Sequence, residues 1–196
     1  MAAKTDRRVR KTKAQLRAGL ARLMQNKSIK EITVKELVDE VDINRSTFYL
    51  HYTDIYQMMD SIEAELMQEI TDAMDDLPDN LVQNMETYPF ITRMFSILKE
   101  NKDICCALLG PNGDMSFVTQ AESLVAETIL KRLSDHFPEN IQNITYAYAF
   151  CLNGCVGLIK TWLLNDDSPS PQDMAQMTYQ FVENTVHYYL EKCKEM

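Results

Sequence analysis

The sequence lacks any alternation of apolar and polar residues long enough to indicate a β-strand, and it has no internal repeat. Its five cysteines have no metal-site spacing, so we interpret them as reduced and buried. No secretory signal peptide is visible, and the most apolar run, 147–164, contains Asn153 and Lys160, which favours a buried helix over a membrane span. No carboxylate pair, metal-ligand set or nucleophile–base arrangement is recognisable. These absences favour a cytoplasmic, all-α protein that is not an enzyme and needs no cofactor.

Charge is distributed unevenly along the chain. The net charge is −9 at pH 7 over 196 residues. Residues 1–55 nevertheless contain twelve Lys/Arg against seven Asp/Glu, whereas residues 56–196 contain eight against twenty-two. A basic N-terminal segment ahead of an acidic body is expected when only one end of a protein contacts phosphate. The distribution favours double-stranded DNA as the partner of the N-terminal segment.

Residues 33–52 have the pattern of two short helices around a tight turn. Thr33 and Glu36 have the spacing of a capping box, and Asn44 is a favourable N-cap for the second helix. The first helix has one apolar face, formed by Val34, Leu37, Val38 and Val41. The second helix carries a cation and three hydroxyl groups, on Arg45, Ser46, Thr47 and Tyr49. This pattern is typical of a helix-turn-helix, whose second helix enters the DNA major groove.

The rest of the chain predicts further helices. We expect a mobile basic arm over 1–8, a helix over 10–25 before the motif, and a long amphipathic helix from Ile55 to about residue 75. This last helix contains no Gly or Pro, so it should connect the two parts of the chain stiffly. The domains are therefore expected to be a three-helix DNA-binding domain, 1–54, and a helical effector-binding and dimerisation domain, 55–196. The final helix is apolar over most of its circumference, which indicates a second subunit beside it.

Thr33-Val34, Leu37 and the run 46–52, STFYLHY, with the helix before them, resemble the TetR family of bacterial transcriptional regulators. The resemblance covers residues 10–60. The segment 150–164, FCLNGCVGLIKTWLL, is also similar to the penultimate helix of a DhaS-like subgroup. The chain has Asp42 where the family usually has a turn glycine, and Ile55 where it often has a lysine. Asp tolerates left-handed backbone better than most residues, whereas Ile55 removes one expected phosphate contact.

The resemblance implies a homodimeric, ligand-responsive regulator, most often a repressor, on a palindromic operator. The residues expected to bind DNA are Thr33, Asn44, Arg45, Ser46, Thr47, Tyr49, His51, Lys11 and Lys13. Arg45 should pair with guanine, and by the resemblance Tyr49 and His51 contact the DNA backbone. The alternatives are a solvated charge for Arg45 and packing at the helix corner for Tyr49 and His51. Leu50 should contact either a thymine methyl group or the small-domain core.

Two further surfaces are predicted in the body. Its many methionines and aromatic residues suggest a small apolar effector, with a pocket lined by Met67, Met74, Met94, Phe117, Tyr146 and Phe150; the alternative is ordinary core. The homodimer interface is expected at Gly154, Leu158, Phe181, Thr185 and Tyr188. An alternative function is a DhaS-like co-regulator whose body binds a protein partner instead of a small molecule. No contact with a membrane is expected.

Overall fold

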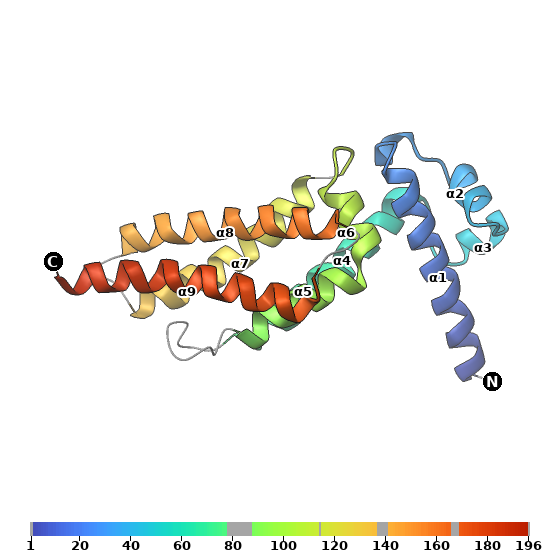
Figure 1. Cartoon of the computed structure of the whole chain (residues 1–196). Coiled ribbons are helices and arrows are strands. Elements are labelled where there is room, and N and C mark those ends of the chain that lie inside the picture. The colour runs from blue at the N-terminus through green and yellow to red at the C-terminus, as the bar shows by residue number, and fades with distance from the viewer. Residues whose placement is uncertain (1, 78–87, 114, 137–140, 166–168, 196) are drawn as a thin grey trace. The chain divides into compact units, whose positions relative to one another are not determined.

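The computed structural model describes residues 2–77, 88–113, 115–136, 141–165 and 169–195, and their side chains except those of 2–6, 136, 141–144 and 186–195. Every regular element in these ranges is helical, as predicted. In chain order the elements are α1 (Ala2–Met24), the 3-10 turn η1 (Ile29–Glu31), α2 (Val34–Glu40), α3 (Arg45–Tyr49), α4 (Ile55–Met74), α5 (Tyr88–Glu100), α6 (Lys102–Leu109), α7 (Met115–His136), α8 (Ile141–Leu163) and α9 (Pro171–Glu195) (Figure 1).

The helices form two compact units. Unit 1 comprises Met1–Met67 and Asn101–Val118, and unit 2 comprises Gln68–Glu100 and Thr119–Met196. Helices α4 and α7 each contribute residues to both units. Among the described residues, no helix combines the length and apolar character that crossing a bilayer requires.

Unit 1 is built around α1, which packs against α2 on one side and α6 on another. Its fully buried side chains come from α1, α2, α3, α4 and α6 and include Leu16, Leu20, Leu37, Phe48, Met58 and Leu108. Gly19 lets α1 and α2 approach closely, because a Cβ there would overlap Val41 Cγ1. The turn after α6 secures the end of α1, since Asn112 Nδ2 donates to the carbonyls of Met24 and Gln25 at 3.4 and 3.2 Å.

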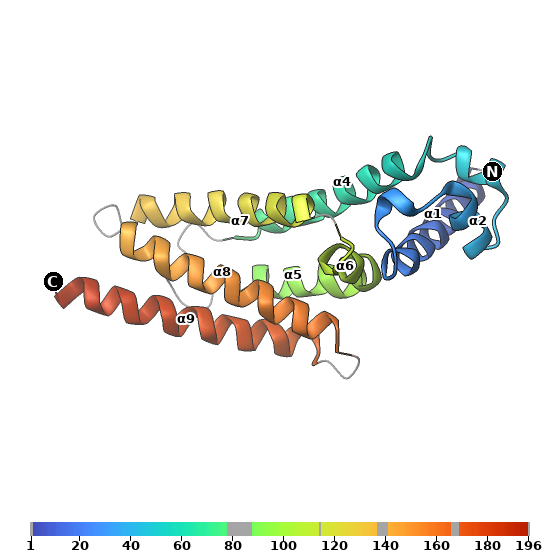
Figure 2. The ribbon, with the colours of Figure 1, turned by 90° about the horizontal axis from the view of Figure 1, so that it is seen from above.

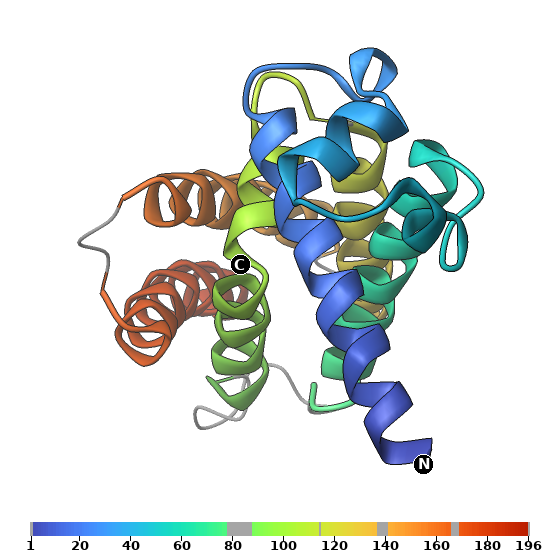
Figure 3. The ribbon, with the colours of Figure 1, turned by 90° about the vertical axis from the view of Figure 1, so that its right-hand side faces the viewer.

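Unit 2 is a bundle in which α9 packs against both α5 and α8 (Figure 2). Figure 3 views α8 and α9 nearly end-on, with α5 (green) beside α9. The rings of Phe95 and Trp162 meet edge to face with centroids 5.2 Å apart, and Trp162 Nε1 donates to Pro169 O at 2.9 Å. Helix α9 begins at a cap in which Ser170 Oγ accepts from the Asp173 N–H at 3.2 Å.

Two predictions about local structure need correction. Helix α1 begins at Ala2, not near Arg10. The N-terminal sequence contains several good helix formers and no Gly or Pro, so the helix can extend through it. The capping box of α2 is only half formed: Thr33 Oγ1 accepts from the Glu36 N–H at 3.2 Å. The Glu36 carboxylate instead accepts from Lys27 Nζ, a partner outside the local motif.

Candidate nucleic-acid interface

The turn between α2 and α3 has the geometry that a helix-turn-helix requires. Asp42 has φ of 52°, the only positive φ of a non-glycine residue in the described chain. The turn is closed by a backbone hydrogen bond from Ile43 N–H to Val38 O at 3.0 Å. Asp42 thus adopts the left-handed conformation that the family usually gives to glycine, as predicted.

Two ion pairs brace the first helix of the motif from outside. Lys27 binds the Glu36 carboxylate, and this hydrogen bond lowers the pKa of Glu36. At the other end of α2, Arg22 Nε donates to Glu40 Oε1 at 2.7 Å. Both pairs lie at the protein surface, where ion pairs add little to stability. They connect the two ends of α2 to the last turn of α1 and the loop after it.

Two of the residues predicted to bind DNA, Asn44 and Ser46, form the N-terminal cap of α3. Asn44 Oδ1 accepts from both the backbone N–H and the Oγ–H of Ser46, each at 2.9 Å. The cap fixes the start of α3, as predicted. Asn44 therefore has a structural role at this helix end whatever it does on DNA.

Phe48 anchors α3 in unit 1, and its neighbours face outward. Phe48 has no exposed surface. Leu50 is 79% exposed, which excludes the predicted alternative that it belongs to the small core. Arg45 and Ser46 are exposed, Tyr49 is 48% exposed and Thr47 is half-buried. The outer side of α3 and its C-cap consequently carries a guanidinium group, hydroxyl groups and the Leu50 side chain.

Arg45 and Tyr49 are paired across one turn of α3. Arg45 Nη2 and Nε donate to Tyr49 Oη at 3.0 and 3.4 Å. The Arg45 guanidinium carbon also lies 5.5 Å from the centre of the Tyr49 ring. The Tyr49 ring contacts Phe48 edge to face, with centroids 5.5 Å apart. Arg45 is therefore held by a neighbour rather than being a freely solvated charge.

At the corner after α3, two of the residues predicted to bind DNA, Lys13 and His51, lie near the buried Tyr52. Tyr52 is buried, and this burial raises the pKa of its phenol. Lys13 Nζ lies 5.6 Å from the centre of the Tyr52 ring, and the half-buried His51 ring lies 6.4 Å from it. Lys11 is exposed on α1. His51 thus packs at the corner and stays partly exposed, and its contact with the DNA backbone remains a prediction.

Arg17, one turn from Lys13 on α1, has a different environment. Its Nη2 donates to Asn101 Oδ1 at 2.7 Å, and Nη1 lies 3.7 Å from Glu65 Oε2. Arg17 therefore joins α1, α4 and the start of α6 within unit 1, and its charge is engaged by protein.

The predicted effector-pocket residues are divided between the two units. Met67 and Phe117 belong to unit 1, while Met74 and Met94 lie in one apolar cluster of unit 2. Tyr146 and Phe150 are 75% and 72% exposed, so they do not line an enclosed pocket of a single chain. Helical periodicity identifies the apolar faces of α8 but does not say which face the same chain covers. The prediction is corrected for these two residues.

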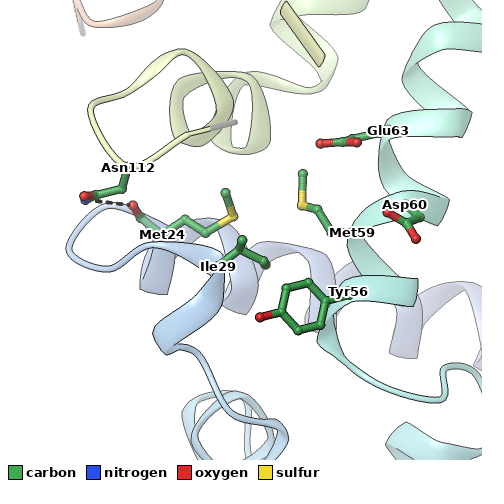
Figure 4. Close-up of a pocket in the computed structure, with 7 residues that line it drawn as sticks. All are labelled: Met24, Ile29, Tyr56, Met59, Asp60, Glu63 and Asn112. Carbon is green, nitrogen blue, oxygen red and sulfur yellow. Dashed lines mark hydrogen bonds between the residues drawn. The ribbon is translucent and has the colours of Figure 1, made fainter. Parts of the chain in front are cut away.

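Unit 1 contains a cleft of about 70 Å³ that sequence reasoning missed (Figure 4). Its walls come from α1, η1, α4 and the turn after α6, through Met24, Ile29, Tyr56, Met59, Asp60, Glu63 and Asn112. Figure 4 shows the Met24 and Met59 side chains between the Asn112 turn and α4. Residues from four separate segments carry no joint sequence signal, which is why the cleft could not be predicted.

Two of the predicted dimer residues, Gly154 on α8 and Phe181 on α9, are uncovered in the single chain. A Cβ added at Gly154 or Gly157 would meet no heavy atom within 4 Å. Phe181 is 59% exposed on α9, and Leu158 and Thr185 are half-buried. Tyr146 and Phe150 precede Gly154 at helical intervals of four residues, so they extend the same row. The side chain of Tyr188 lies outside the described residues.

Comparison with known proteins identifies the family. A family model described as the C-terminal region of TetR-type transcriptional regulators matches residues 85–184, just over half of the chain. The chain belongs to the TetR family of transcriptional regulators. Its DNA-binding motif and its helical body, which were described separately above, are thus parts of one kind of regulator.

Individual relatives are distant. An uncharacterised HTH-type transcriptional regulator, YxbF of Bacillus subtilis, is 22% identical over 189 residues, which cover 90% of this chain and 46% of that protein. The chain therefore spans about half the length of this curated relative. A TetR regulator from Streptococcus agalactiae has a TM-score of 0.55 at 21% identity, covering 93% of this chain and 99% of that one. The dihydroxyacetone kinase operon activator DhaS has a TM-score of 0.50 at 15% identity, covering 94% and 97%. These likenesses are of fold and do not assign the chain to a DhaS-like subgroup.

Proposed function

We propose that this TetR-family protein is a homodimeric repressor that binds a palindromic operator and releases it when an effector binds the helical body. The observation that carries the proposal is α3, where the buried Phe48 supports a row of exposed polar and apolar side chains. Such a row matches the donors, acceptors and thymine methyl groups of the major groove. In this proposal residues 1–54 bind DNA, and residues 55–196 bind the effector and the second subunit.

The contacts divide into base readout and backbone positioning. Arg45 reads guanine, Leu50 contacts a thymine methyl group, and Ser46 and Thr47 bond either a base or a phosphate. Thr33 and His51 contact the DNA backbone from the two ends of the motif, and Tyr49 lies beside Arg45. Lys11, Lys13 and the other cations of α1 supply the nonspecific, salt-dependent part of the affinity. Asn44 acts mainly by fixing the start of α3.

The proposed dimer forms through the uncovered face of α8 and α9. Exposed aromatic rings at Tyr146, Phe150 and Phe181 supply apolar surface, and the open Gly154 lets a helix of the second copy approach closely. A two-fold axis there would present the same face of each subunit to the other. The two α3 helices would then sit in successive major grooves about 34–36 Å apart.

The effector is proposed to bind inside the body and to change the separation of the two DNA-binding domains through α4. Continuous helix over Ile55–Met74 provides the stiff connection that this mechanism requires. A small-molecule effector is supported by two buried hydroxyl groups, on Tyr148 and Thr178, that have no hydrogen-bond partner among the described residues. The Tyr148 phenol, whose pKa is raised by burial to about 12, is protonated near neutral pH and can donate to a ligand. Release follows only if the effector prefers the wide-spaced state.

The proposal is tested by selecting binding sequences from a random duplex library with the purified protein, then comparing Arg45→Ala with wild type at fixed salt. Arg45→Ala should weaken binding by about 5- to 150-fold for each half-site of the selected sequence, the range for one bidentate Arg–guanine pair. Arg93→Ala is the matched control, because Arg93 pairs with Asp76 at 2.6 Å in unit 2 and has no proposed DNA contact. If Arg45→Ala and Arg93→Ala bind the site equally well, α3 is not the recognition helix.

A further inference from the structure

The Arg45–Tyr49 pair points to a role for Tyr49 other than the backbone contact described above. We propose that Tyr49 is a positioning residue: it holds the guanidinium of Arg45 in the orientation that reads one guanine, and so sets base specificity more than overall affinity. The inference rests on the proposed DNA binding and assigns the origin of specificity within that interface.

The hydrogen bonds determine which edge of the guanidinium remains for a base. Tyr49 Oη accepts from Nη2 at 3.0 Å and from Nε at 3.4 Å, so it occupies the Nε–Nη2 edge. The outer edge, formed by Nη1 and the second proton of Nη2, is directed away from Tyr49. That edge can donate two parallel hydrogen bonds to guanine O6 and N7. Tyr49 therefore leaves one end-on orientation in which Arg45 can read a base.

Tyr49 is itself held in place. Its ring meets the fully buried ring of Phe48 edge to face, with centroids 5.5 Å apart. The guanidinium also lies over the Tyr49 ring, with its carbon 5.5 Å from the centre. The chain of contacts thus runs from the core through Phe48 and Tyr49 to Arg45. An otherwise flexible arginine is ordered before DNA arrives.

Ordering Arg45 in advance should act on specificity. A freely moving guanidinium can turn toward another acceptor when the base is wrong, whereas a fixed one leaves its donors unpaired. A positioned Arg45 also loses less side-chain freedom on binding the correct base. A tyrosine that acted only as a phosphate ligand would behave differently, because phosphate contacts carry no direct sequence information. The two roles therefore predict different patterns across a set of sites.

The first measurement uses the free protein. Tyr49→Phe keeps the ring over the guanidinium and removes the hydroxyl acceptor. By nitrogen-detected NMR, hydrogen exchange of the Arg45 Nε–H should become about two- to tenfold faster, the range for losing one hydrogen bond. Tyr56→Phe is the matched control, because Tyr56 is another half-exposed tyrosine of unit 1, at 53%. Unchanged exchange in Tyr49→Phe would overturn the positioning role, whatever the protein does on DNA.

The second measurement uses the site selected by the wild-type protein and its three single-base variants at the guanine opposite Arg45. Tyr49→Phe should reduce discrimination at this one base pair by about two- to tenfold, because binding to the selected site weakens while the freed Arg45 can find another acceptor on the variant sites. In the Arg45→Ala background the same substitution should have no effect, because Tyr49 acts through Arg45. An equal loss on all four sites that persists without Arg45 would overturn positioning in favour of a phosphate contact. If wild type enriches no sequence, the proposed function fails, and the exchange measurement still decides the role of Tyr49.

Discussion

The substitution Gly19→Ala in unit 1 should have two effects of opposite sign on stability. Gly19 lies inside α1, where alanine is favoured over glycine by about 1 kcal/mol. The added Cβ, however, would overlap Val41 Cγ1 and lie 3.1 Å from Leu37 Cδ1. Val41 is stiff about χ1, so the overlap cannot be relieved cheaply. Overpacking of this kind costs about 1–3 kcal/mol, toward the upper end here because two side chains are met.

The net expectation is that Gly19→Ala lowers the free energy of unfolding by about 1–2 kcal/mol, or about 2–8 °C in melting temperature for a chain of this size. Urea denaturation followed by circular dichroism at one protein concentration measures it. Val41→Ala removes the overlapping methyl group, so the double variant should be more stable than the sum of the two single changes predicts. A Gly19→Ala protein as stable as wild type, or a strictly additive double variant, would refute the close α1–α2 contact as the reason for glycine.

Three other substitutions test separate parts of the molecule. Phe181→Asp, on the exposed face of α9, should convert the proposed dimer to a folded monomer. Analytical ultracentrifugation measures the mass of the particle in solution, and an unchanged mass would contradict the proposed dimer face. Leu50→Ala should change the free energy of unfolding by no more than about 0.5 kcal/mol, because the side chain is 79% exposed. The same substitution should weaken binding to sites that contain the contacted thymine. If the wild-type protein binds equally well when uracil replaces that thymine, the methyl contact is excluded. Because Lys27 lowers the pKa of Glu36 below its usual 4.5 in the folded protein, the pair stabilises the fold above that pH and the effect is lost as pH falls through the lowered pKa. Glu36→Gln should therefore be less stable than wild type at pH 7, and this difference should disappear in acid titrations of stability.

Local chemistry made much of the motif predictable. Thr33 and Asn44 are caps within three residues of the groups they bind, so their roles can be read from sequence spacing. Asp42 was expected in left-handed backbone because the turn demands it, and its φ of 52° agrees.

Contacts between distant segments were not predictable in the same way. Glu36 fits a capping box by spacing, yet its carboxylate binds Lys27 because the 3-10 turn brings that residue close. Tyr146 and Phe150 look like core residues by composition, and only the packing of α5, α8 and α9 reveals that they face outward. The Arg45–Tyr49 pair has helical i, i+4 spacing, but which acceptor the guanidinium chooses depends on side-chain geometry.

The net negative charge of the whole chain is compatible with DNA binding, because in the bound state the electrostatic interactions that matter are those between nearby charges. At physiological ionic strength, charges more than about 8 Å apart in solvent are largely screened. In the proposed complex, acidic residues farther than this from the DNA have little effect on the contacts of α1 and α3. The salt dependence of binding should then follow the number of cations that meet phosphate, among which we propose Lys11 and Lys13, and not the net charge of −9. The sequence pI of about 4.8 reflects the charge of the whole chain. The basic segment 1–55 supplies the cations that are proposed to contact DNA.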